Sequence, residues 1–265
     1  MIEILHLDFM QNALLAGLLV SIACGVVGSL VVINRMGFIA GGIAHGAYGG
    51  IGIAFFFSFE PLLGASTFSL LLALIIAKIT FIDKNKIDSI IGAIWAFGMA
   101  LGIILIDLTP GYNVDLMSYL FGSILAVSDT DLVFMLILNS IFILLVSTLY
   151  RQFVAISFDM EFAKLRGVNV KLLYYIMVCM MALCVVATIR VVGLILVIAL
   201  ISIPSIIASG FAKRLGSMMV LSSIIASVFC IIGLILSFEF DLTSGASIIL
   251  VASVFFFIFC FRFKK

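Results

Sequence analysis

The sequence predicts an all-α fold, a polytopic bundle of about nine transmembrane helices with a range of eight to ten. Apolar residues make up 65% of the chain and charged residues only 10%, whereas a soluble domain carries about 25% charged residues. Nine apolar stretches are long enough to cross the hydrocarbon core, which needs roughly 20 residues per helix. Because the gaps between them are short, we expect residues 1–265 to form a single membrane domain.

The nine predicted spans are separated by short polar or turn-forming gaps. The second is rich in glycine, the third begins after Pro61, and the seventh contains Pro204, which lacks a backbone donor and is expected to bend its helix. The predicted spans cover residues 11–33, 38–59, 62–82, 89–107, 132–150, 171–189, 191–212, 216–238 and 244–261.

The charged residues between the spans sort by side. One set of alternate gaps holds twelve of the fourteen basic residues: Arg35, Lys84, Lys86, Arg151, Lys164, Arg166, Lys171, Lys213, Arg214, Arg262, Lys264 and Lys265. The other set is acidic and contains a single base, Arg190. Since basic residues favour the cytoplasmic side, we expect the N-terminus outside and the C-terminus in the cytoplasm.

An apolar stretch of about eleven residues, 117–127, lies between the fourth and fifth spans. It is too short to cross a bilayer. A re-entrant or interfacial helix preserves the alternation of the charges, whereas a tenth span would move every later gap to the other side of the membrane.

Span two contains a histidine among many glycines. Its glycines are Gly41, Gly42, Gly46, Gly49, Gly50 and Gly52. Small residues at three- and four-residue spacing allow close packing of helix backbones. Two interpretations remain open: the glycines serve packing alone, or they also leave room for a pathway beside His45.

His45 is the only histidine within a predicted span. Ionisable residues at membrane depth usually face a bundle interior or an aqueous cavity, and a neutral imidazole is a good ligand for transition metals. A hydrogen-bonded packing role is the alternative. Tyr48 lies three residues further on the same helix face, where it would order His45 or line the same path.

The segment from Ser237 to Gly245 closes the eighth span at the acidic side. Its Glu239 and Asp241 are hard oxygen ligands that would attract a cation. An ordinary solvated acidic loop explains the same residues. Ser237 and, in the preceding span, Pro204 are candidates to line a pathway.

The longest polar stretch on the basic side, Ser157 to Val168, has the pattern of an amphipathic helix. Gly167 is placed as its terminating residue. A helix lying on the lipid surface and a docking helix for a cytoplasmic partner are both consistent with this pattern. The residues concerned are Phe158, Asp159, Glu161, Phe162, Lys164, Leu165, Arg166 and Gly167.

Several catalytic and binding motifs are absent from the sequence. No Gly-Lys pair occurs, which excludes a phosphate-binding Walker loop, and neither HExxH nor GxSxG is present. We therefore expect no ATP hydrolysis by this chain alone and no enzymatic activity. No basic stripe outside the membrane ends indicates nucleic-acid binding.

Four segments in order resemble the permease subunit of zinc, manganese and iron ABC importers, most closely the bacterial zinc-uptake permease. They are the first two spans from MQNALLAGLL to AHGAYGGIG, then FDMEFAKLRGV, RVVGLILVIALISIPSIIAS and DLTSGASIIL. The resemblance runs essentially end to end. It implies that FDMEFAKLRGV is a coupling helix and that Pro204 lies in a typical permease segment.

The resemblance also implies a metal pathway. The family's span-two pattern, roughly G-D-A-x-S-H, retains its histidine here as His45, whereas Gly41 stands in place of its aspartate. The family's D-L-P-S-G pattern keeps its acid as Asp241. His45 and Asp241 are therefore implied as transient ligands, and Glu239 is a candidate to supply the charge missing at Gly41.

The implied mechanism is ATP-driven import of a divalent metal across the bacterial inner membrane. Zinc is the first expectation, with manganese or ferrous iron as alternatives, and no cofactor is expected to be bound permanently. The implied partners are a cytoplasmic ATP-binding cassette subunit, an extracytoplasmic metal-binding protein and a second copy of the chain. An ABC permease for a metal chelate or vitamin, a secondary transporter and an intramembrane enzyme are the alternatives.

Overall fold

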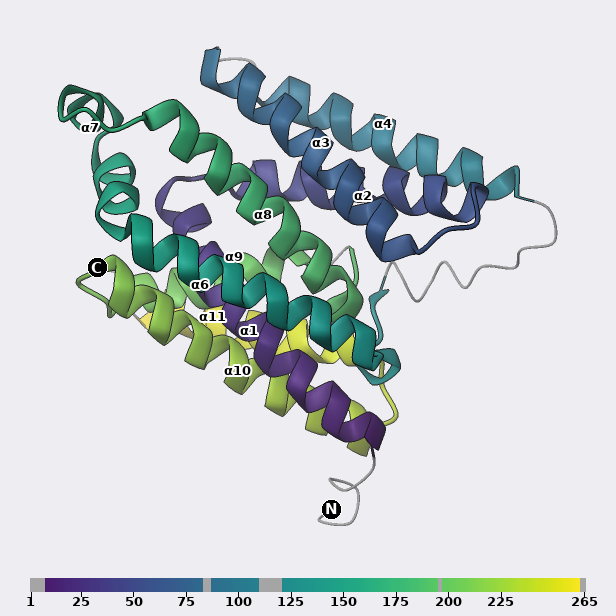
Figure 1. The fold of residues 1–265 in the computed structure, drawn as a ribbon. Coiled ribbons are helices and arrows are strands. Elements are labelled where there is room, and N and C mark those ends of the chain that lie inside the picture. The colour runs from purple at the N-terminus through teal and green to yellow at the C-terminus, as the bar shows by residue number, and fades with distance from the viewer. Residues whose placement is uncertain (1–7, 83–86, 110–120, 195–196, 263–265) are drawn as a thin grey trace. The chain divides into compact units, whose positions relative to one another are not determined.

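The computed structural model describes residues 8–82, 87–109, 121–194 and 197–262, and the regular structure within these ranges is helical (Figure 1). Eight of these helices are long and apolar enough to cross a membrane. The all-α fold predicted from the sequence is confirmed. The elements are α1 Asp8–Ile33, α2 Gly37–Phe56, α3 Pro61–Ile82, α4 Ile87–Asp107, the 3₁₀ turn η2 Ile124–Ala126, α6 Asp129–Phe158, α7 Met160–Leu165, α8 Val170–Val192, α9 Val197–Ser209, α10 Leu215–Glu239 and α11 Ser244–Arg262.

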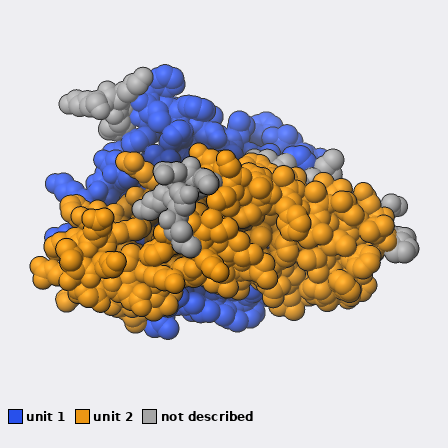
Figure 2. Space-filling view, turned by 90° about the horizontal axis from the view of Figure 1, so that it is seen from above, with its two compact units in different colours: residues 1–32, 117–145, 187–265 blue, residues 33–116, 146–186 orange. Residues whose placement is uncertain are grey.

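The chain divides into two compact units, which are coloured separately in Figure 2. Unit 1 comprises residues 1–32, 117–145 and 187–265, and unit 2 comprises residues 33–116 and 146–186. Both α6 and α8 contribute residues to each unit. Whether residues 1–265 act as one domain stays a prediction.

In unit 2, α2 packs against both α3 and α4. Every residue of α2 from Ile39 to Gly52 is buried. A helix that is apolar all round must be enclosed by other helices, and the small residues of α2 let its neighbours approach closely. The packing role proposed for its glycines is therefore confirmed, whereas a pathway beside His45 stays a prediction.

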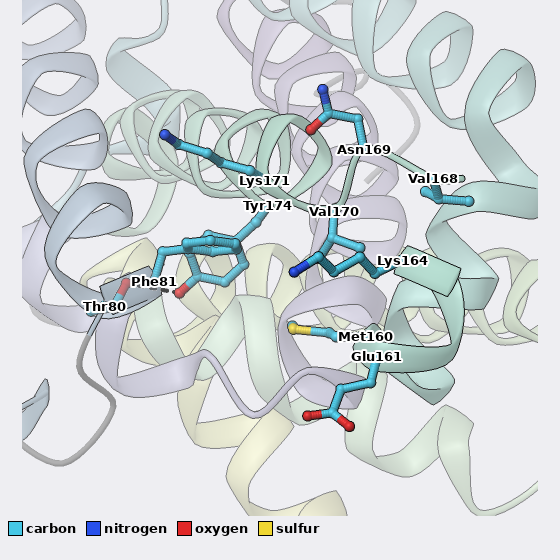
Figure 3. Close-up of a pocket in the computed structure, with 10 residues that line it drawn as sticks. All are labelled: Thr80, Phe81, Met160, Glu161, Lys164, Val168, Asn169, Val170, Lys171 and Tyr174. Atoms are coloured by element: carbon cyan, nitrogen blue, oxygen red, sulfur yellow. Dashed lines mark hydrogen bonds between the residues drawn. The ribbon is translucent and has the colours of Figure 1, made fainter. Parts of the chain in front are cut away.

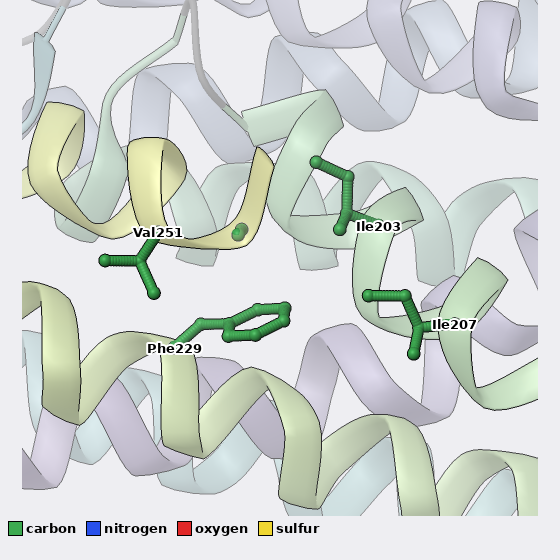
Figure 4. Packing of buried hydrophobic residues seen from close by; sticks show 5 residues of the cluster. Ile203, Ile207, Phe229 and Val251 are labelled. Atoms are coloured by element: carbon green, nitrogen blue, oxygen red, sulfur yellow. The ribbon is translucent and has the colours of Figure 1, made fainter. Parts of the chain in front are cut away.

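In unit 1, helices α9, α10 and α11 pack on one another. Their shared core contains Ile203, Ile207, Phe229, Val251 and Ala252 (Figure 4). A hydrogen bond of 2.8 Å between the buried Ser205 and Ser222 hydroxyls adds a polar link between α9 and α10. Polar side chains commonly join helices in membranes in this way.

The predicted seventh span, 191–212, is wrong as a single continuous helix. Helix α8 continues to Val192, Gly193 adopts a left-handed φ of 81°, and α9 begins only at Val197. The 13 residues of α9 extend about 20 Å at about 1.5 Å per residue, less than the hydrocarbon thickness of roughly 30 Å. Hydropathy detects the apolar run but not the interruption of its helix. Pro204 lies buried inside α9, and its predicted bend stays a prediction.

The predicted helix at 117–127 lies partly outside the described residues. Its described part begins at Phe121, which is helical, and continues through Gly122 and Ser123 to the 3₁₀ turn η2. The Ile124 amide donates a hydrogen bond of 3.3 Å to Ser244 Oγ at the start of α11. Whether this stretch forms a re-entrant or interfacial helix stays a prediction, because residues 117–120 lie outside the described residues.

Arg190, the single base predicted among the acidic gaps, forms an ion pair within unit 1. Its guanidinium donates to both carboxylate oxygens of Asp131, at 3.1 Å from Nε and 2.7 Å from Nη2. Ser128 adds two further hydrogen bonds to the same carboxylate, one from its amide and one from its hydroxyl. The carboxylate is nearly fully buried, with 3% of the side chain exposed. A bidentate partner therefore explains why this base lies apart from the other basic residues.

Candidate functional site

His45 lies in the buried part of α2, stacked on Trp95 of α4. The two ring centroids are 3.8 Å apart and the ring planes differ by 8°. His45 is 8% exposed, and its Nδ1 atom is buried without a hydrogen-bond partner among the described residues. An unpaired buried polar atom destabilises a fold by about 1–3 kcal/mol, so this nitrogen is a candidate for an additional ligand.

Glycines hold α2 and α4 close enough for this stacking. A Cβ atom on Gly98 would lie 2.5 Å from the Cα and 2.7 Å from the carbonyl oxygen of Gly46. One on Gly52 would lie 2.6 Å from the Cα of Gly102. Since only glycine tolerates such backbone contact, these positions set the separation of the helices. Trp95 lies almost one turn before Gly98, and His45 lies directly before Gly46. The close approach of the two glycines therefore brings the Trp95 and His45 rings together.

The indole of Trp95 is itself held in place from its own helix. Its Nε1–H donates a hydrogen bond of 3.2 Å to the sulfur of Met99, one turn later in α4. The thioether is therefore occupied by the indole. What the arrangement leaves available is a neutral imidazole nitrogen in an apolar environment, a group that binds transition metals well.

The acidic candidates lie in unit 1, at the junction of α10 and α11. Glu239 is the last residue of α10, Asp241 adopts a left-handed φ of 51°, and both are exposed. The Ser237 hydroxyl donates a hydrogen bond of 2.6 Å to the Leu242 carbonyl, and the Leu242 amide donates back to the Ser237 carbonyl at 2.9 Å. Ser237 therefore closes this turn and holds the two carboxylates near the surface.

The remaining candidates divide between the two units. Tyr48 is buried on α2 in unit 2, where Gly102 of α4 faces its backbone, and Pro204 is buried in unit 1. Among the residues that the structure describes, no three His, Cys, Asp or Glu side chains gather closely enough to hold a metal ion. The assignment of His45, Asp241 and Glu239 as metal ligands stays a prediction.

The predicted amphipathic helix is shorter than the sequence pattern suggests. Helix α6 continues through Phe158, and the extended residue Asp159 separates it from α7. The Asp159 carboxylate accepts hydrogen bonds from the amides of Glu161 at 2.8 Å and Phe162 at 3.1 Å. This side-chain cap starts a new helix where periodicity alone predicts a continuous one.

Gly167 terminates α7 as predicted. It adopts a left-handed φ of 79°, its amide donates to the Lys164 carbonyl at 3.0 Å, and the Val168 amide donates to the Ala163 carbonyl at 3.1 Å. These two bonds form a Schellman motif, which satisfies the last carbonyl groups of a helix. The six-residue helix is therefore capped at both ends.

The apolar residues predicted for one face of this helix are exposed in this chain. Phe158 is 92% exposed, Leu165 87% and Phe162 50%, while Ala163 is fully buried. The Arg166 guanidinium lies 5.2 Å from the centre of the Phe162 ring. Large side chains this exposed typically mark a surface for another protein or for lipid.

The other side of α7 borders a cavity of about 440 Å³ in unit 2 (Figure 3). Glu161 and Lys164 of α7 line it together with Tyr174 of α8 and residues of α3. Tyr174 and Thr80 share a hydrogen bond of 2.9 Å between their hydroxyls. Helix α7 is therefore positioned beside a link between α3 and α8.

Sequence reasoning missed Trp95 and the partnership of Asp131 with Arg190. Trp95 is the single tryptophan of the chain and precedes two glycines spaced by four residues, Gly98 and Gly102. That spacing matches the glycines of span two and was a usable indication that the two helices pack together. The ion pair joins residues 59 positions apart, for which no local pattern exists.

The profile of the ABC 3 transport family matches residues 6–262. This chain belongs to the ABC 3 transport family. It is therefore a membrane transport subunit, as its sequence motifs predict, and the resemblance to ABC permeases is confirmed. Membership in an ABC family favours an ATP-driven system over the secondary transporter and the enzyme considered above.

Related proteins match along almost the whole chain. The manganese transport system membrane protein MntC of Listeria monocytogenes is 36% identical, covering 96% of this chain and 91% of its own. An uncharacterized membrane protein of Synechocystis is 51% identical over 96% of this chain and 90% of its own. The solved structure of PsaBC from Streptococcus pneumoniae in complex with Fab superimposes with a TM-score of 0.88 at 33% identity, covering 98% of this chain and 94% of that one.

Proposed function

We propose that this chain is the permease subunit of an ABC importer that moves Mn²⁺ into the cytoplasm. The observation that carries the proposal is the buried Nδ1 of His45, which has no hydrogen-bond partner among the residues that the structure describes, in a chain of the ABC 3 transport family. A transported divalent ion needs groups that replace its water shell inside the membrane, and His45 offers one. The metal is the cargo, and no permanently bound cofactor is part of the proposal.

Manganese replaces zinc as the first candidate. The expectation of zinc has no specific support, because the relative named for its substrate, MntC of Listeria monocytogenes, is a manganese transport protein. Imidazole accepts several transition metals, whereas carboxylates favour harder ions such as Mn²⁺. Glu239 and Asp241 suit that preference. We propose that they attract the cation and that His45 binds it within the span, with Tyr48, Ser237 and Pro204 lining the route.

The proposal assigns α7 to a cytoplasmic ATP-binding cassette subunit. Phe158 at the end of α6 and Leu165 at the end of α7 are exposed and supply apolar contacts. Glu161, Lys164 and the C-cap residue Arg166 supply charges around them. Nucleotide binding in the partner would shift the permease between outward- and inward-facing states, because the docked helix interacts differently with the two. An extracytoplasmic metal-binding protein delivers the ion, and a second copy of this chain completes the transporter.

The proposed orientation follows from the charges. With the N-terminus outside and the C-terminus in the cytoplasm of the bacterial inner membrane, the segment around α7 lies on the basic, cytoplasmic side. That side is where ATP is available. Labelling of a cysteine placed at Leu165 by a membrane-impermeant reagent is expected only after cells are opened, and labelling of intact cells would contradict the proposal.

Replacing His45 by alanine is expected to lower Mn²⁺ uptake by about tenfold to a hundredfold. Mutating a residue that only hydrogen-bonds to a metal ligand already lowers metal affinity or activity by about that factor. Uptake of radioactive manganese by cells that express the complete transporter measures the effect. Ser66→Ala is the matched control, since Ser66 is equally buried at 8% exposure and bonds within its own helix to the Leu62 carbonyl. Unchanged uptake by the His45 variant would remove His45 from the proposed site.

Replacing Leu165 by serine is expected to reduce both ATP-dependent uptake and co-purification of the ATPase subunit by about fivefold or more. The reason is that losing an apolar contact at the centre of an interface weakens binding by about 1 kcal/mol or more. Leu165 is 87% exposed, so folding should change by no more than about 0.5 kcal/mol. Leu172→Ser, at a leucine of α8 that is 56% exposed, is the control. Equal loss in both variants would contradict a specific docking role for α7.

A further inference from the structure

We propose that Trp95 is a positioning residue for the metal-binding imidazole of His45. The inference rests on the proposed function, in which His45 is a ligand of the transported cation. It concerns how the ring is held before the cation arrives.

The stacked geometry restricts His45 to one orientation. With centroids 3.8 Å apart and planes only 8° from parallel, the indole covers one face of the imidazole and opposes rotation of the ring out of its plane. A histidine in a protein is usually oriented by a hydrogen bond from one of its nitrogens to a carboxylate or carbonyl. Nδ1 of His45 has no such bond within the described part of the chain, so the aromatic contact takes over the orienting role at that nitrogen.

The indole can hold the imidazole because it is fixed at two other points. Its own N–H is bonded to Met99 at 3.2 Å, which restricts rotation of the indole. The contact between Gly98 and the backbone of Gly46 fixes the distance between the two helices. Met99 therefore restricts rotation of the Trp95 indole, and the indole in turn restricts rotation of the His45 imidazole.

This arrangement suits a transient ligand. A nitrogen without a hydrogen bond has no protein partner to give up when a cation binds. A ring already held in one plane loses little rotational freedom on binding, and such preorganisation increases affinity. Because the constraint is a stacking contact rather than a charge, it adds no electrostatic attraction that would hold the divalent ion too tightly for release.

Kinetics of uptake by the complete transporter test the role of Trp95. Trp95→Leu removes the ring, and the apparent KM for Mn²⁺ is expected to rise about threefold to tenfold, the factor that corresponds to an aromatic pair, with little change in maximal rate. Trp95→Phe retains a stacking ring and should keep the KM within about twofold of the unchanged protein. If the Leu variant misfolds, Trp95→Met, which fills the space without a ring, replaces it.

Fluorescence supplies a measurement that does not depend on transport. Trp95 is the chain's single tryptophan, so emission of the full-length permease in detergent reports on this position alone. Mn²⁺ is paramagnetic, and its binding at the adjacent His45 is expected to quench that emission. The His45→Ala variant should fold normally and lose the saturable quenching, whereas Ser66→Ala should retain it.

The outcomes separate this inference from the proposed function. If His45→Ala lowers uptake while Trp95→Leu has an unchanged KM, the positioning role is wrong and the proposed function stands. If His45→Ala transports Mn²⁺ normally and shows undiminished quenching, the metal site itself is wrong. Equal impairment by the Phe and Leu variants would also overturn the proposal, because a stacking ring would then be insufficient.

Discussion

Replacing Arg190 by methionine is expected to lower the free energy of unfolding by about 3–5 kcal/mol, because it leaves the Asp131 carboxylate buried without its counter-ion. Only 3% of the Asp131 side chain is exposed, so the carboxylate itself has little contact with water that would compensate for the lost guanidinium. Ser128 retains its two hydrogen bonds to the carboxylate, but these carry no opposing charge. Unfolding of the purified chain by increasing SDS in mixed micelles measures the change.

The double variant Asp131→Leu with Arg190→Met is the control for this prediction. It removes both charges, so it should be clearly more stable than the Arg190 single variant although it differs from the original protein at two positions. The stability of Arg190→Lys should lie between that of Arg190→Met and that of the original protein. An ammonium keeps the charge but cannot form the two parallel bonds of the guanidinium. Additive losses in the double variant would show that the pair does not act as a unit.

Replacing Gly98 by alanine is expected to destabilise unit 2 by about 3 kcal/mol, the upper part of the range for overpacking. The new methyl group would lie 2.5 Å from the Cα of Gly46, and a backbone atom inside a helix cannot move aside as a side chain does. The helices must separate, so Trp95 should also withdraw from His45. The same SDS titration measures stability, and a shift of the tryptophan emission reports the separation.

Gly92 offers a matched control on the same helix. A Cβ atom there would meet no neighbouring atom within 4 Å, so Gly92→Ala should be neutral or stabilising by up to about 1 kcal/mol through its better helix propensity. The two substitutions add the same methyl group to α4. A similar stability of both variants would show that the approach of α2 and α4 does not depend on Gly98.

Helix existence and membrane class were predictable because they depend on properties of contiguous residues. The apolar runs needed no partner to be recognised, and eight of the nine predicted spans correspond to long helices. The seventh was wrong because an apolar run does not have to form one continuous helix. The same composition is compatible with the end of one helix followed by a second, shorter helix. Gly167 was placed correctly because the left-handed turn that ends a helix favours glycine at a position that can be read locally.

The candidate site was predictable only in part. His45 could be selected from the sequence, since an ionisable residue among apolar neighbours is conspicuous. Its contact with Trp95 could not, because ring orientation depends on how α2 and α4 pack. The cap at Asp159 was likewise seen only in the folded structure, since the periodicity of Phe158, Phe162 and Leu165 is equally compatible with one continuous helix.

By itself, the sequence determined the membrane class, most of the spans and the separation of charges, because each follows from transfer of side chains between water and lipid. Tertiary structure alone decided the stacking on His45, the pairing of Arg190 with Asp131 and the exposure of the apolar residues around α7. These features join residues distant in the chain or depend on what its other segments leave uncovered. Short-range contacts between side chains, rather than hydropathy, determine them.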